Sequence, residues 1–67
     1  MMNVIVNGEE REIPENTNLS QLLEILALAS ARVAIELNQN VIRRAEWENA
    51  FLRENDRIEI VHFVGGG

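Results

Sequence analysis

The chain has 67 residues, enough for one small domain and too few for two lobes around a catalytic cleft. Its 46% apolar and 25% charged residues are typical of a globular domain. It has no cysteine and a single histidine, His62, which excludes disulfides, thiolate chemistry and cysteine or histidine-rich metal sites. Eleven acidic residues against six basic ones give a net charge of −5, which argues against binding to a phosphate backbone and favours a basic partner.

All six basic residues are arginines, so the chain carries no side-chain amine for a Schiff base or an isopeptide bond. No apolar run approaches the ~20 residues that span a bilayer. No basic-then-apolar leader precedes the first predicted strand. We therefore expect a cytoplasmic protein.

The first predicted element is a β-hairpin. Apolar residues alternate over residues 3–6, Asn7-Gly8 is a strong two-residue turn signal, and a polar strand follows over residues 9–13. The glutamates of this second strand indicate an exposed sheet edge, and Pro14 ends it because proline has no amide hydrogen.

A helix is predicted next, from Leu19 to about Leu28. Asn18 is its expected N-cap, Gln21 occupies the capping-box position, and leucines recur at helical spacing up to Leu26. No glycine marks its end.

Three more strands complete the pattern. Alternating residues predict a strand over 33–37, a turn at Asn38-Gln39-Asn40 and a return strand over 41–43. Residues 44–50 are expected to be irregular or a single helical turn with Trp47 packed at the core or its rim. Phe51 and Leu52 are expected to pin this crossover to the core, and the last strand is predicted over 57–64.

Two hairpins flanking one helix predict an α+β fold of the β-grasp (ubiquitin-like) type, a mixed sheet with one helix packed on one face. The first and last strands then pair in parallel at its centre, and the domain covers residues 1–64, followed by a flexible glycine tail over 65–67. The expected core consists of the inward-facing residues of these elements: Val4, Val6, Ile13, Leu19, Leu22, Leu26, Val33, Ile35, Leu37, Leu52, Ile58 and Ile60.

Catalytic motifs are not apparent. Ser20, Asp56 and His62 have no spacing that supports a triad, and a chain this short has no cleft to hold one. There is no phosphate-binding glycine loop, and Glu9-Glu10 is expected to be a solvated part of an edge strand. We expect His62 to lie at a partly buried or rim position.

The C-terminal glycines Gly65, Gly66 and Gly67 allow three interpretations: a frayed end, a cloning remnant, or a substrate arm that presents its terminal carboxylate in a narrow channel. The last strand favours the arm. Val61 and Phe63 alternate away from the helix side, and Ile5 and Ala34 are expected on the same face. An uncovered apolar face beside a tail is typical of a docking site, and we include Val64 in it.

Several segments together resemble the ThiS family, the ubiquitin-like sulfur carriers of thiamine biosynthesis. They are Met2-Asn3-Val4-Ile5-Val6-Asn7-Gly8, the Leu22-Leu23 helix, the Asn38 turn, Arg44-Ala45-Glu46-Trp47, residues 55–61 and the Gly66-Gly67 end. The resemblance covers essentially the whole chain. Gly65 is an addition to the motif, and Asn38-Gln39-Asn40 departs from the Asn-Gly often found there.

The resemblance implies a carrier that is not itself an enzyme and binds no cofactor. An adenylating enzyme of the ubiquitin-activating type would use ATP to activate the carboxylate of Gly67. Sulfur from a donor such as a cysteine desulfurase would convert it to a thiocarboxylate, and thiazole synthase would take up that sulfur. Ile5, Val61, Phe63 and Val64 would bind the partners. The alternatives are a carrier like the small subunit of molybdopterin synthase, a protein-modifying tag, and a β-grasp adaptor with inert glycines.

Overall fold

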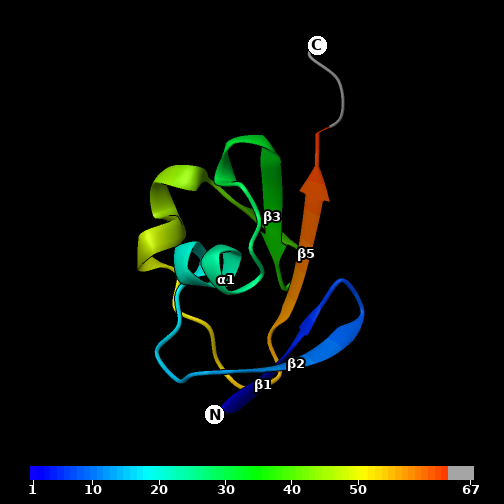
Figure 1. The fold of residues 1–67 in the computed structure, drawn as a ribbon, viewed down its shortest axis with the longest axis vertical. Coiled ribbons are helices and arrows are strands. Elements are labelled where there is room, and N and C mark those ends of the chain that lie inside the picture. Colours follow the sequence, from blue (N-terminus) through cyan, green and yellow to red (C-terminus); the bar gives the residue numbers. More distant parts are fainter. Residues whose placement is uncertain (64–67) are drawn as a thin grey trace.

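The structure, a computed structural model, describes residues 1–63 (Figure 1). Five strands form one sheet in the order β2-β1-β5-β3-β4, and the described part of the chain also has one α-helix and two short 3-10 helices. Along the chain the elements are β1 (Met2–Val6), β2 (Glu9–Ile13), α1 (Leu19–Ile25), η1 (Ser30–Arg32), β3 (Val33–Leu37), β4 (Asn40–Ile42), η2 (Arg44–Asn49) and β5 (Arg57–His62).

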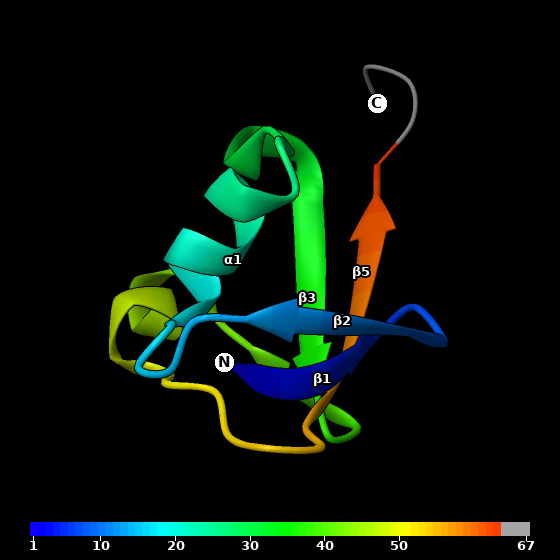
Figure 2. The same ribbon diagram turned by 60° about the horizontal axis from the view of Figure 1, so that its bottom comes forward.

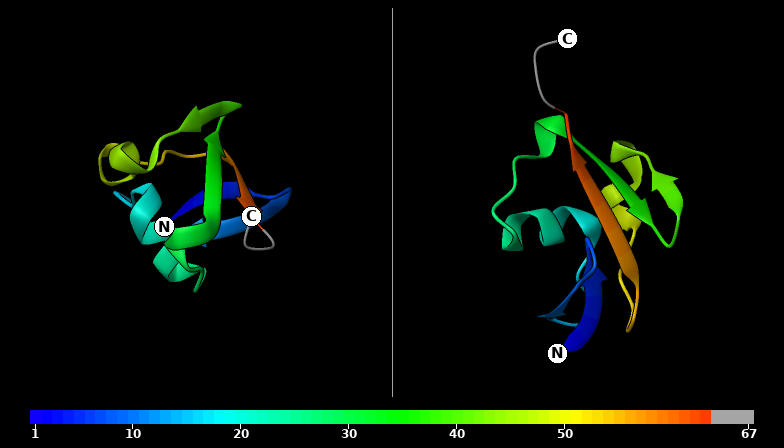
Figure 3. Two further views of the ribbon diagram at one scale, coloured as in Figure 1. Left: turned by 90° about the horizontal axis from the view of Figure 1, so that it is seen from above. Right: turned by 90° about the vertical axis from the view of Figure 1, so that its right-hand side faces the viewer.

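The sheet has the predicted β-grasp arrangement. β1 and β5 pair in parallel at its centre, where Ile5 lies opposite Arg57 and Val6 opposite Ile58. β2 and β3 are the antiparallel outer neighbours of this pair. Seen from above, α1 and η2 lie on the same side of β3 and β5 (Figure 3), so helices cover one face of the sheet.

The first hairpin is built as predicted. Asn7 and Gly8 have φ values of 50° and 83°, the left-handed backbone that a two-residue hairpin turn requires at both central positions. β2 forms the edge of the sheet, and Glu9–Glu12 are all exposed. Charged side chains along this edge disfavour pairing with a strand of another chain.

Helix α1 begins as predicted and ends earlier. The Asn18 side chain accepts a hydrogen bond from the backbone N–H of Gln21 (2.8 Å), and the Gln21 side chain accepts one from the backbone N–H of Asn18 (3.0 Å). The helix ends at Ile25 rather than near Leu28, because Ala27 takes a φ of 58° that breaks the helical path. Leu28 still packs against the core.

The core lies between the sheet and the helices. Ten of the twelve predicted core residues are buried; Leu26 and Leu37 are half-buried and pack against its margin. Met2, Leu23 and Trp47 are further members. The expectation for Phe51 is wrong: it is 55% exposed, whereas Leu52 beside it is buried. Phe51 takes part in a β-bridge with Asn18 at the start of α1, so its backbone is fixed while its side chain faces outward.

Trp47 ties the crossover segment to the sheet. Its Nε1–H donates to the backbone carbonyl of Ile42 in β4 (2.9 Å) while its ring is buried. The Arg44 guanidinium lies 5.4 Å from the centre of the Trp47 ring, and its Nη2 donates to the carbonyl of Ser30 (2.8 Å). These contacts join η2, β4 and η1.

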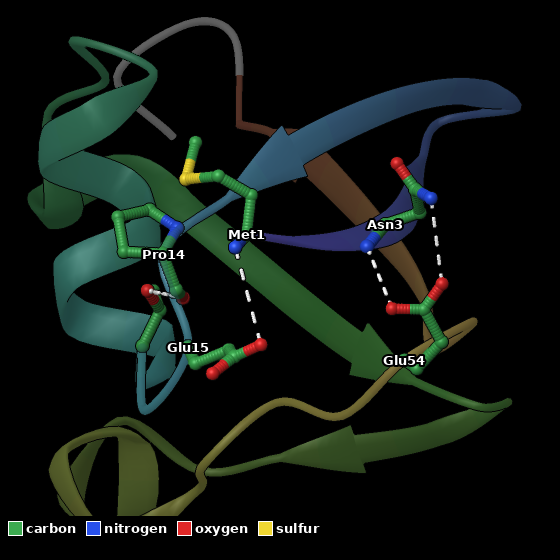
Figure 4. A network of polar contacts seen from close by, with 6 residues as sticks. Met1, Asn3, Pro14, Glu15 and Glu54 are labelled. Atoms are coloured by element: carbon green, nitrogen blue, oxygen red, sulfur yellow. Dashed lines mark hydrogen bonds and ion pairs between the residues drawn. The ribbon is translucent and has the colours of Figure 1, made fainter.

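The N-terminal end makes polar contacts with two other segments of the chain (Figure 4). The Met1 ammonium lies 3.9 Å from a Glu15 carboxylate oxygen. The backbone N–H of Asn3 donates to Glu54 Oε1 (2.9 Å), and the backbone N–H of Asn55 donates to the Asn3 carbonyl (2.7 Å). The turn before β5 is thereby fixed against β1.

Across residues 1–63, no helix is long and apolar enough to cross a membrane.

Candidate functional site: the uncovered face and C-terminal end of β5

β5 is buried on one side and exposed on the other, and apolar residues lie on both sides. Ile58 and Ile60 face the helices and are buried. Val61 lies on the other face and is 55% exposed, and Phe63 directly after the strand is 58% exposed. In Figure 2, β5 runs upward and away from β1 and the N-terminus, and Val61 and Phe63 lie where the chain leaves the sheet.

Of the residues predicted on this face, Ala34 lies beside Val61 and Ile5 lies at a distance from Val61. Ala34 lies opposite Val61 in the β3–β5 pairing and is half-buried. Ile5 lies opposite Arg57, four residues before Val61, which places it about 13 Å back along the strand at ~3.3 Å per residue. We call Ala34, Val61 and Phe63 the sheet-face patch. Val64 and Gly65, Gly66 and Gly67 lie outside the described residues.

Acidic side chains border the sheet-face patch. Glu36 on β3 lies directly opposite Glu59 on β5, and both are exposed. Val41 on β4 lies opposite Glu36 and is 70% exposed, an apolar residue of this face that the sequence analysis did not identify. Like charges directly opposite one another destabilise a sheet. The arrangement therefore suits a partner that carries basic groups around an apolar contact.

The C-terminal end of β5 is held from both sides. On the β3 side, His62 lies opposite Val33, and the N–H of Phe63 donates to the carbonyl of Arg32 (2.8 Å). On the β1 side, the side chain of Asn7 forms two hydrogen bonds with the backbone of Ile60.

An open groove of about 310 Å³ lies on the helix side, between the first hairpin, the end of α1 and the end of β5. Its lining includes Asn7, Arg11, Leu28, Ile60 and His62. His62 is exposed there, in agreement with the predicted rim position.

The three residues considered for a triad are not together. Asp56 precedes β5 and His62 is its last residue, so they lie at opposite ends of the strand. The Asp56 carboxylate instead accepts hydrogen bonds from the backbone N–H of Arg53 (2.8 Å) and from Asn38 Nδ2 (3.0 Å), which order the turn. Within residues 1–63 no cluster of three potential metal ligands occurs.

A model of the ThiS family matches residues 4–67, nearly the whole chain. The chain belongs to this family. Its fold agrees with that assignment: the crystal structure of the thiamine biosynthesis protein (ThiS) of Geobacter metallireducens superposes with a TM-score of 0.85, is 35% identical, and covers 98% of this chain and 100% of that one.

Two further relatives of this ThiS-family chain differ in length. It is 36% identical to the sulfur carrier protein ThiS of Bacillus subtilis, over 92% of this chain and 96% of that protein. It is 41% identical to a thiazole synthase of Magnetococcus marinus over 98% of this chain, and there it spans only 20% of the relative's length. The chain is therefore similar to one segment of this larger thiazole synthase.

Proposed function

We propose that the protein is a sulfur carrier of thiamine biosynthesis whose reacting group is the carboxylate of Gly67. The observation that supports this most is the similarity to the sulfur carrier of Bacillus subtilis over nearly the full length of both chains. The family match extends to Gly67, so the proposed reacting residue lies inside the shared region.

Each step of the proposed reaction requires an enzyme, a sulfur donor or a reductant other than this chain. A carboxylate oxygen of Gly67 attacks the α-phosphate of ATP on an adenylating enzyme, which releases pyrophosphate and forms an acyl-adenylate. The terminal sulfur of a persulfide on a donor such as a cysteine desulfurase then displaces AMP and forms an acyl disulfide. A thiol reductant cleaves its S–S bond, is itself oxidised to a disulfide with the donor sulfur, and leaves the thiocarboxylate. The chain has no cysteine and no lysine of its own to form a thioester or an isopeptide bond, so it acts as substrate and carrier. The need for ATP makes the cytoplasm the proposed compartment.

We assign partner binding to the sheet-face patch together with Val64, with Ile5 as a separate contact further back on the same face. The exposure of Val61 and Phe63 and the acidic border formed by Glu36 and Glu59 support this assignment. The adenylating enzyme and thiazole synthase are the proposed partners. The likeness to a segment of a thiazole synthase supports the second of them.

The test is mass spectrometry of the intact chain after incubation with an adenylating enzyme of the ubiquitin-activating type, ATP, a sulfur donor and a thiol reductant. The expected result is the mass gain from replacing one carboxylate oxygen by sulfur, located at Gly67 by fragmentation. The matched control is the chain extended by one alanine after Gly67, which moves the carboxylate by ~3.3 Å. Because a misplacement of about 1 Å costs on the order of a hundredfold in rate, the control should convert far more slowly.

A parent chain that never gains this mass would overturn the carrier function and leave the adaptor alternative. Equal conversion of the extended chain would instead show that the position of the Gly67 carboxylate does not limit the reaction.

A further inference from the structure

Asn7 does more than form the first turn. Its Oδ1 accepts a hydrogen bond from the backbone N–H of Ile60 (2.8 Å), and its Nδ2 donates to the Ile60 carbonyl (3.3 Å). Its own backbone N–H donates to the carbonyl of Ile58 (2.9 Å). One turn residue therefore contacts two successive inward-facing residues of β5.

These contacts begin where the strand pairing of β1 stops. The register of β1 with β5 consists of Ile5 opposite Arg57 and Val6 opposite Ile58, after which β1 enters its turn. The primary amide of Asn7 has one acceptor and one donor, as a backbone peptide does. It thus takes the place of the next strand residue and satisfies both backbone groups of Ile60.

We propose that Asn7 is a positioning residue for the reaction at Gly67: together with the contacts of His62 and Phe63 to the β3 side, it fixes where β5 leaves the sheet. This inference rests on the proposed function. The seven steps from Ile60 to Gly67 span about 23 Å when extended on a partner. Displacement of Ile60 shifts the point from which this arm starts, and a misplacement of ~1 Å at the reacting carboxylate already impairs catalysis.

Asn38 provides a matched control at the other end of the same strand. It is also a turn asparagine with a positive φ, 52°, against 50° at Asn7. Its Oδ1 accepts from the backbone N–H of Arg57 (3.0 Å), and its backbone N–H donates to the Arg57 carbonyl (2.8 Å). It therefore holds the start of β5 much as Asn7 holds Ile60, but far from the exit of the chain.

The experiment compares Asn7→Gly with Asn38→Gly. Glycine adopts positive φ without cost, so each variant keeps its turn and loses only its side-chain hydrogen bonds. Both should lower the melting temperature by similar amounts. Only Asn7→Gly should speed amide hydrogen exchange at Ile60, by about tenfold or more, because only it removes the acceptor of that N–H.

The functional readout is ATP-dependent pyrophosphate release by the adenylating enzyme at a temperature where both variants are folded. For Asn7→Gly we expect kcat to fall about tenfold with KM within about twofold, because the sheet-face patch is unaltered while the arm is misplaced. For Asn38→Gly both constants should stay within about twofold. Asn7→Asp keeps an acceptor for the Ile60 N–H and should restore part of kcat.

Equal losses of kcat in the two glycine variants, or a change of KM alone in Asn7→Gly, would overturn the inference. Unchanged exchange at Ile60 in Asn7→Gly would overturn it as well. If Ile60 exchanges faster but the parent chain itself releases no pyrophosphate, the proposed function is wrong, and the catalytic part of this inference falls with it.

Discussion

Trp47 shows how much a single residue contributes to the stability of a domain of this size. Trp47 is 4% exposed, and its ring N–H donates to the carbonyl of Ile42 in β4, one of the two edge strands of the sheet. A buried carbonyl that loses its donor costs about 1–3 kcal/mol. In a small domain that is a large fraction of the total stability.

We expect Trp47→Phe to lower the free energy of unfolding by about 1–3 kcal/mol, because phenylalanine fills most of the ring site but cannot donate to Ile42. Urea denaturation measures the change. Arg44→Gln is the control, because it removes the exposed guanidinium over the same ring and should cost less than about 1 kcal/mol. A Trp47→Phe domain as stable as the parent would show that the hydrogen bond contributes nothing.

Among the elements, the pairing of β3 with β5 places two like charges opposite one another. Glu36 and Glu59 face one another directly on the uncovered side of the sheet. A partner with basic groups relieves that repulsion, so the pair costs stability in the free protein and favours association.

Glu36→Gln should therefore raise the free energy of unfolding by about 0.2–1 kcal/mol and slow association with the proposed partner, the adenylating enzyme, most clearly at low salt. Denaturation and stopped-flow binding measure the two effects. Glu24→Gln, on the exposed side of α1, changes the net charge equally and should produce neither. If both variants behave alike, net charge rather than the Glu36–Glu59 pair is responsible.

The strands were predictable within one or two residues because alternation, the Asn-Gly turn and the Asn18 cap all act locally. The end of α1 was not, because it depends on Ala27 adopting a left-handed backbone that alanine rarely takes. Hydrophobic periodicity also does not show which aromatic residue of the crossover segment is buried. Trp47 is buried and Phe51 is exposed, although both lie in that segment.

The candidate site was predictable in the same partial way. The exposure of Val61 and Phe63 follows from alternation along β5, and the structure confirms it. The distance of Ile5 from them follows from the parallel register of β1 and β5, which no local pattern contains. The roles of the glycines and Val64 stay predictions, since they lie beyond the described residues.

The sheet has one covered and one uncovered face, and the described part of the molecule carries two exposed phenylalanines in different places. Phe63 follows β5 beside the sheet-face patch, and Phe51 lies at the start of α1, in a β-bridge with Asn18. Their exposed fractions are nearly equal, 58% and 55%, so they form a matched pair for a binding test.

We expect Phe63→Ala to weaken binding to the proposed partner, the adenylating enzyme, by about 1–2 kcal/mol, because an aromatic anchor buried on binding contributes that or more. Phe51→Ala should leave binding unchanged, and neither should shift the melting temperature noticeably. Titration calorimetry measures the affinity. Equal effects of the two substitutions would move the docking surface away from the sheet-face patch.

The central place of the last strand has a consequence for synthesis of the chain. β1 is made first, yet one of its two neighbours is β5, and pairings between such distant segments form late in folding. A truncated polypeptide that lacks β5 cannot bury Ile58 and Ile60 and leaves the inner edges of β1 and β3 open. Only a chain translated at least through β5 can therefore complete the sheet and form the uncovered face to which we assign partner binding.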